Sequence, residues 1–149
     1  MILFIHLLFG AAVGSAVKNI PLAVVLAFLS HYFLDFLPHI EYDIANIREK
    51  QWQKKLAVIL KVILDFCLGI LLILIFSNNQ PILYLYAIIA MLPDALTIVN
   101  NFLSNKILEA HYAFHTKKIH FLKYKKISVF WRISSQIAAI IISIILLKI

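Results

Sequence analysis

The stretch "LAVILKVILDFCLGILLILIF", residues 56–76, decides the class of the fold. A helix needs about 20 consecutive apolar residues to cross the hydrocarbon core of a bilayer, and this stretch is long enough. The whole chain has the same character, because apolar residues make up 63% of its 149 residues, whereas a soluble domain contains about 45–50%. The composition therefore excludes an ordinary soluble protein and predicts a single integral membrane domain over residues 1–149.

Four further apolar stretches lie on either side of this span. They are residues 2–17, 21–37, 81–92 (with an extension to about 103 beyond Pro93) and 127–147. The first two are short for a full crossing, so they could form a hairpin that enters the bilayer without spanning it. We therefore predict an all-α fold, a polytopic membrane helix bundle with four to five transmembrane helices.

The lysines and arginines predict how this bundle is oriented. If all five stretches cross, the N-terminus and the polar segments 38–55 and 104–126 lie on one side. That side carries ten basic residues: Arg48, Lys50, Lys54, Lys55, Lys106, Lys117, Lys118, Lys123, Lys125 and Lys126. The other side carries Lys18 and Lys148. Under the positive-inside rule both segments are cytoplasmic, and the formal charge of +7 then reflects topology and contact with membrane lipids rather than nucleic acid.

Two features of the apolar stretches predict contacts between helices. Lys61 and Asp65 lie four residues apart within 56–76, and an intramembrane carboxylate needs a partner. Either the two charges neutralise each other, or Asp65 orients a metal ligand such as His6 through a hydrogen bond. Gly10 and Gly14 form a GxxxG pattern, which predicts that the first helix packs closely against a neighbour.

All six histidines lie at or near the predicted cytoplasmic ends of the helices. The stretch "SHYFLDFLPHIEYD", residues 30–43, places two of them and two aspartates at a spacing of four. Residues four apart share one face of a helix, so His31 and Asp35 can offer two ligands to one ion. The same spacing joins His111 and His115. Imidazole together with carboxylate is a ligand set for zinc, iron or manganese.

We therefore predict a divalent metal site, with zinc as the first choice and iron or manganese as alternatives. The single Cys67 excludes a site built from several cysteines. Asp43, as a carboxylate left off the metal, is the candidate general base. The candidate ligands are His6, His31, Asp35, His39, Asp94, His111 and His115.

Each of these residues also has a purely structural explanation. Asp35 and His39 could face water at the headgroups, and "HYAFHTKKIH", residues 111–120, could form an interfacial amphipathic helix. His6 could bond to another helix, and Asp94 could cap the helix that follows it. None of these explanations accounts for four separate segments that carry such groups at one depth, and this agreement favours the metal site.

Three short motifs resemble those of a known family. They are His6 followed by Gly10 and Gly14, the helix end "SHYFLD" at 30–35, and the "LPD" at 92–94. Together they resemble the bacterial membrane-bound metal-dependent hydrolases, described as LexA-binding and inner-membrane-associated. Where that family has an "HRGxTHS" segment, this chain has "HYAFHTKKIH". The resemblance implies the bacterial inner membrane, a metal site and hydrolysis, and it names no substrate.

The function predicted from these observations is metal-dependent hydrolysis at the cytoplasmic membrane face, with activated water attacking a phosphoester or lipid-headgroup bond. One alternative is a membrane di-iron oxidoreductase, which would use the HxxxH of His111 and His115. Another is a metal or proton transporter with Lys61 and Asp65 on its path. A scaffold that binds no metal is a third.

Overall fold

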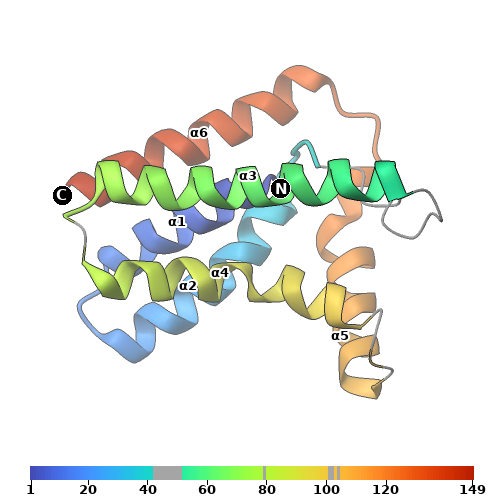
Figure 1. The fold of residues 1–149 in the computed structure, drawn as a ribbon, viewed down its shortest axis with the longest axis horizontal. Coiled ribbons are helices and arrows are strands. Elements are labelled where there is room, and N and C mark those ends of the chain that lie inside the picture. Colours follow the sequence, from blue (N-terminus) through green and yellow to red (C-terminus); the bar gives the residue numbers. More distant parts are fainter. Residues whose placement is uncertain (42–51, 79, 101–102, 104) are drawn as a thin grey trace.

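The computed structural model describes residues 1–41, 52–78, 80–100, 103 and 105–149. Within these ranges every regular element is a helix, which confirms the all-α prediction (Figure 1). The elements are α1 (Leu3–Ser15), α2 (Ile20–Phe36), α3 (Trp52–Phe76), α4 (Pro81–Val99), α5 (Lys106–Lys117), the 3-10 helix η2 (Ile119–Tyr124) and α6 (Val129–Lys148).

Three of these helices are long and apolar enough to cross a membrane. The candidate spans are Leu56–Phe76 in α3, Pro81–Val99 in α4 and Val129–Lys148 in α6. α1 has 13 residues and α2 has 17, so both are shorter than a full span, as the first two apolar stretches predict. The structure thus supports a membrane protein with three candidate spans, and any larger number depends on α1 and α2.

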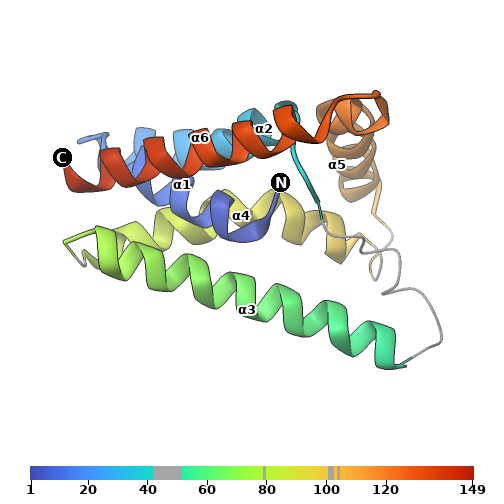
Figure 2. The ribbon, with the colours of Figure 1, turned by 90° about the horizontal axis from the view of Figure 1, so that it is seen from above.

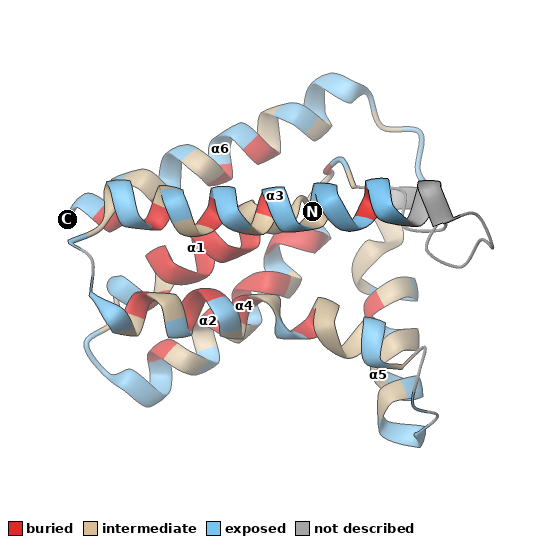
Figure 3. Cartoon of the chain, viewed as in Figure 1, coloured by how far each residue is buried: buried red, intermediate tan, exposed pale blue. Residues whose placement is uncertain are grey.

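The short helix α1 lies at the centre of the bundle. α2, α3, α4 and α6 all pack against it (Figures 1 and 2). Every residue from Ile5 to Ala12 is buried, whereas large apolar side chains such as Phe33, Leu64 and Phe130 are exposed on the outer helices (Figure 3). Exposed apolar side chains on all outer helices are what a lipid environment requires, because lipid chains solvate them.

The two glycines of the GxxxG pattern bring α1 against α4. A Cβ atom on Gly10 would overlap the Cβ of Ala90, and a Cβ on Gly14 would overlap the ring of Tyr86. Small residues let two helix backbones approach closely in a membrane, where tight packing drives helix association. The predicted close packing of the first helix is therefore confirmed, and α4 is its partner.

The beginning of α1 is capped by a side chain from α3. Oδ2 of Asp65 accepts the backbone N–H of Phe4 at 3.0 Å, and Asp65 is buried. The first N–H groups of a helix have no partner within the helix, and in an apolar interior each needs one. Asp65 thus serves the end of α1, a role that differs from the pairing with Lys61 and the contact with His6 considered from the sequence.

α5 and η2 cover the end of the bundle where α1 begins and α2 ends. α5 runs across the direction of the long helices, at the right in Figure 1, and it packs against α4 while η2 packs against α2. This arrangement carries the histidines of 111–120 to the buried ends of α1 and α2.

The segment that follows α2 is held by a polar face of α6. The carbonyl of Pro38 accepts the hydroxyl of Ser135. Arg132 donates to the carbonyl of His39 and Gln136 donates to the carbonyl of Ile40, both at 3.2 Å. Because Pro38 ends the helix, these carbonyls have no helical partner, and α6 supplies the donors that an apolar environment does not.

Candidate metal centre

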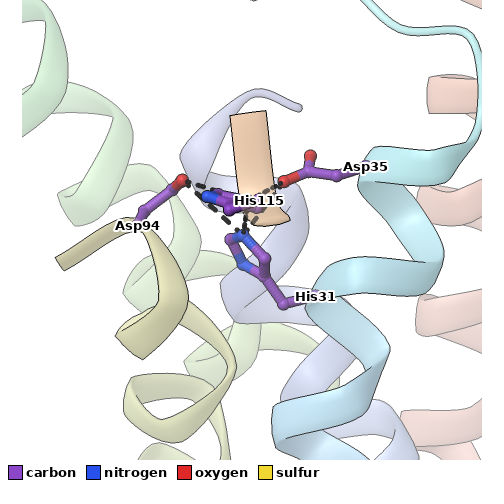
Figure 4. A group of neighbouring side chains, drawn as sticks. All are labelled: His31, Asp35, Asp94 and His115. Carbon is purple, nitrogen blue, oxygen red and sulfur yellow. Dashed lines mark hydrogen bonds and ion pairs between the residues drawn. The ribbon is translucent and has the colours of Figure 1, made fainter. Parts of the chain in front are cut away.

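Four side chains from three helices meet at one point beside the beginning of α1. They are His31 and Asp35 of α2, Asp94 of α4 and His115 of α5, with one potential ligand atom from each lying within 4.8 Å of all the others. Their side chains converge from α2, α4 and α5 (Figure 4). His31, Asp35 and His115 are at most 1% exposed, whereas the side chain of Asp94 is 37% exposed.

The distances within this four-residue cluster match those between ligands of one small cation. Nε2 of His31 lies 2.9 Å from Oδ2 of Asp35 and 3.2 Å from Nε2 of His115. Nε2 of His115 lies 3.1 Å from the same oxygen of Asp35. In a tetrahedral zinc site with bonds of about 2.0–2.1 Å, neighbouring ligand atoms lie about 3.3 Å apart. The three buried groups therefore already have the spacing that a zinc ion requires.

Asp94 lies slightly outside this spacing. Its Oδ1 is 3.6 Å from Nε2 of His31 and 4.0 Å from Nε2 of His115. It sits one residue after Pro93, which lies inside α4 and has no N–H to donate to the preceding turn. Asp94 is thus the least buried member of the cluster and the one that lies farthest from the other ligand atoms.

Both histidines of the cluster are oriented by a second contact. Nδ1 of His31 lies 2.8 Å from the carbonyl oxygen of Ala90 and can only donate to it. Nδ1 of His115 lies 3.0 Å from Oγ1 of Thr97, whose own hydroxyl donates to the carbonyl of Pro93 at 3.0 Å. A histidine that binds a metal commonly donates its other N–H in this way, which fixes the tautomer and the ring orientation.

These contacts have an electrostatic consequence. When each ring carries a single proton, on Nδ1, the Nε2 lone pairs of His31 and His115 face each other over 3.2 Å and face a carboxylate oxygen of Asp35. Lone pairs that face one another in a buried site repel unless a cation or a proton lies between them. The donor set of two imidazoles and two carboxylates suits zinc, iron or manganese.

A second group adjoins the first and shares Asp35 with it. Asp35, His39 and His120 also bring potential ligand atoms within 4.8 Å of one another. Nε2 of His120 lies 3.1 Å from Oδ2 of Asp35, and its Nδ1 lies 2.6 Å from Oε1 of Glu41. Nε2 of His39 lies 2.8 Å from the same oxygen of Glu41. The two groups therefore form one continuous polar network at the ends of α1 and α2.

His6 lies on the other side of Asp35. Its Nε2 is 3.2 Å from Oδ1 of Asp35, and its ring stacks on that of His31 with the centroids 4.1 Å apart. The N-terminal ammonium group of Met1 forms a buried ion pair with the same oxygen. His6 thus contacts the shared carboxylate but belongs to neither ligand group.

His111, a predicted ligand, lies beside the cluster and not in it. Its ring centroid is 5.6 Å from that of His115, and its Nε2 lies 3.0 Å from the hydroxyl of Tyr32. Burial and the nearby charges of His115 and His31 lower its pKa. The fourfold spacing does place His111 and His115 on neighbouring turns of α5, but the structure brings only His115 to the shared centre.

The sequence did not single out His120 and Glu41. Burial lowers the pKa of His120, but hydrogen bonds to Asp35 and Glu41 outweigh this effect and raise it to about 9. His120 follows His115 by five residues, which is not a spacing that shares a helix face; η2 redirects the chain after α5 and brings it back. Asp43, the predicted general base, lies outside the described residues.

No protein-family model, curated protein or solved structure matches the chain. Its function is therefore inferred from the geometry of the two residue groups.

Proposed function

We propose that the protein is a membrane-embedded, metal-dependent hydrolase whose ion is bound by His31, Asp35 and His115, with Asp94 at the open side. The observation that carries this proposal is the convergence of two oriented imidazole nitrogens, 3.2 Å apart, on one carboxylate oxygen at 2.9 and 3.1 Å. A catalytic zinc site typically has three protein ligands and keeps a fourth position for water or substrate. Asp94, at 3.6 and 4.0 Å from the two nitrogens, leaves room for that position.

The resemblance noted in the sequence supports the same proposal. His31 and Asp35 of "SHYFLD" and Asp94 of "LPD" are three of the four residues that meet in the cluster. Two motifs that lie far apart in the chain thus supply one centre. We propose membership of the membrane-bound metal-dependent hydrolases on this ground.

The residues of the cluster suggest a division of roles. When bound, a divalent ion activates water as a nucleophile at neutral pH and polarises the bond that is attacked. His31, Asp35 and His115 hold the ion, and their burial excludes competing water. Asp94 is partly exposed and carries a carboxylate, so it can take the proton of the attacking water as the new phosphorus–oxygen bond forms. It returns that proton to the leaving oxygen when the ester bond breaks.

The contacts of α1 support a site within the apolar layer. Asp65, which caps α1, lies nine residues after Leu56, about 14 Å along α3 at 1.5 Å per residue. On α4, Asp94 lies five residues before Val99. We therefore propose a site below the membrane surface, deeper than the sequence predicts, in the half that contains the Leu56 end of α3. The basic residues assign that half to the cytoplasmic side.

This depth favours a membrane lipid as the substrate. A lipid can bring its headgroup phosphoester to the site while its acyl chains stay in the bilayer. A soluble substrate must instead lose its hydration water before it enters. The three candidate spans are joined by the shorter apolar helices α1 and α2, and we propose four to five transmembrane helices only if one or both of these also cross.

The proposal is tested by metal analysis and hydrolysis assays on protein purified in detergent. We expect bound zinc, iron or manganese in the wild type, and release of headgroup from phosphatidylcholine vesicles or of nitrophenol from bis(4-nitrophenyl) phosphate. His115→Ala lowers the metal content and removes the hydrolysis, whereas the matched control His111→Ala, on the same helix but outside the cluster, retains both. A wild-type protein that takes up no metal, or a His115→Ala variant with the metal content and activity of the wild type, contradicts the proposal.

A further inference from the structure

We propose that the centre holds two metal ions, and that a second ion is bound by His39, His120, Glu41 and Asp35. The inference rests on the proposed function, because Asp35 is common to both sites. Its basis is the second group of potential ligand atoms, from Asp35, His39 and His120, which lie within 4.8 Å of one another and share Asp35 with the first group.

Asp35 contacts histidines of both ligand groups. Its Oδ2 lies 2.9 Å from Nε2 of His31 and 3.1 Å from Nε2 of His115, both in the first site. In the second group, Nε2 of His120 lies 3.1 Å from the same oxygen, and Nε2 of His39 lies 3.7 Å from Oδ1, the oxygen that also pairs with the ammonium group of Met1. A carboxylate that contacts both ligand sets can bridge two ions. Two-metal hydrolytic sites keep their ions about 3.5–4 Å apart, a distance that one carboxylate spans.

His39 is oriented as a metal ligand. Its Nδ1 lies 2.6 Å from the carbonyl oxygen of Leu37, to which it can only donate. With Nδ1 protonated, Nε2 of His39 faces Oε1 of Glu41 at 2.8 Å. The side chain of His39 is 5% exposed, so this close contact needs either a proton or a metal ion between the two atoms. This is the relationship seen for His31 and His115 in the first site.

His120 completes the second set. Its Nδ1 lies 2.6 Å from the same oxygen of Glu41, so one carboxylate oxygen lies between the rings of His39 and His120. The other ring nitrogen, Nε2, can donate to Oδ2 of Asp35 at 3.1 Å. An ion placed between these groups would be bound by the imidazoles of His39 and His120 and the carboxylates of Glu41 and Asp35. This is again a ligand set for zinc, iron or manganese.

The backbone that carries this set is held in place from outside the centre. The carbonyls of Pro38, His39 and Ile40 are each bonded by a side chain of α6. α6 has no side chain in either ligand group, so it acts on the second site only by positioning the segment that bears His39 and Glu41. A segment fixed in this way is expected of a metal site, whose ligands need supporting contacts.

A metal count of the purified full-length protein, by mass spectrometry after equilibration with excess Zn²⁺ and removal of free ion, tests the inference. We expect two equivalents in the wild type and one in His39→Ala, with His111→Ala retaining both. Glu41→Gln, which keeps the size of the side chain, provides a second variant with one expected equivalent in case His39→Ala does not fold. Exchange with Mn²⁺ adds a spectroscopic readout, since two bridged Mn²⁺ ions give a coupled paramagnetic spectrum and one does not.

The outcomes separate this inference from the proposed function. One equivalent in the wild type that survives in both His39→Ala and Glu41→Gln but is lost in His115→Ala overturns the second site and leaves the first intact. Two equivalents in both second-site variants overturn the ligand set proposed here. No bound metal in the wild type contradicts both proposals, and an uncoupled Mn²⁺ spectrum at two equivalents contradicts the bridge.

Discussion

Nδ1 of His31 lies 2.8 Å from the carbonyl oxygen of Ala90, and the Cβ of Ala90 is the atom that a side chain on Gly10 would overlap. One residue of α4 thus joins the packing of α1 to the orientation of a candidate metal ligand on α2. The centre therefore adjoins the close contact between α1 and α4. Changes to the packing should therefore alter metal binding as well as stability.

The close contact between α1 and α4 predicts a compensating pair of substitutions. Gly10→Ala forces a methyl group into Ala90 and should lower the free energy of unfolding by about 1–3 kcal/mol, the usual cost of overpacking. Ala90→Gly in the same chain removes the overlapping Cβ and should restore much of that loss. Unfolding in mixed detergent measures both. Equal stability of the single and the double variant would show that the two residues do not touch.

The hydroxyl of Thr97 should matter for metal affinity although it does not reach the ion. It accepts from Nδ1 of His115, so Thr97→Val removes the group that orients the ring while keeping its shape. Loss of such a supporting contact typically weakens metal binding by about 10- to 100-fold. Competition with a chromophoric chelator measures the affinity.

A matched control for Thr97→Val is Thr116→Val. Thr116 lies next to His115 on α5, but its hydroxyl bonds to the carbonyl of Tyr112. We expect its affinity for Zn²⁺ to equal that of the wild type. A loss of the same size in both variants would mean that the effect comes from the helix and not from His115.

The capping of α1 by Asp65 can be separated from a pairing with Lys61. Asp65→Leu leaves the N–H of Phe4 without its acceptor in an apolar interior, which should cost about 1–3 kcal/mol of stability. Asp65→Asn keeps an acceptor oxygen and should cost less. Lys61→Met should change little. A Lys61→Met variant as unstable as Asp65→Leu would instead favour an ion pair between the two.

The polar face of α6 should support the second metal site from a distance. Gln136→Leu removes the donor to the carbonyl of Ile40 and leaves that carbonyl unsatisfied, with an expected cost of about 1–3 kcal/mol. Because the segment carries His39 and Glu41, we expect zinc at the second site to bind more weakly than at the first. Stepwise removal of Zn²⁺ with a chelator would reveal this. The neighbouring substitution Ser134→Ala is the control, and equal release from both variants would exclude the positioning role.

Metal binding should also stabilise the folded protein. A ligand that binds only the folded state at 100 times its dissociation constant adds about 2.7 kcal/mol, so Zn²⁺ should raise the midpoint of thermal unfolding and a chelator should lower it. We expect this shift in the wild type and in His111→Ala, and a smaller shift in His115→Ala, which loses a ligand of the first site. Light scattering or intrinsic fluorescence during heating would follow it. The same shift in all three proteins would indicate binding elsewhere.

The sequence alone determined the class of the fold and part of the site. The apolar stretch 56–76 has the length of a membrane span, and GxxxG predicts a close helix contact; both follow from local composition and spacing, so no tertiary information is needed. Fourfold spacing likewise joined His31 to Asp35, because a helix puts such residues on one face whatever it packs against. The gathering of His31, Asp35, Asp94 and His115 was expected from their shared depth, and the structure places them together.

Only the tertiary structure decided which of the remaining polar residues belong to the centre. His111 has the same fourfold spacing to His115 but faces Tyr32, and His120 has no favourable spacing yet returns to Asp35 through η2. Asp65 caps α1, although its spacing to Lys61 suggested a pair. In each case the partner lies on a different helix. Packing between helices sets the angle at which α5 crosses the bundle and the point at which α1 begins. Neither can be predicted from a local sequence pattern.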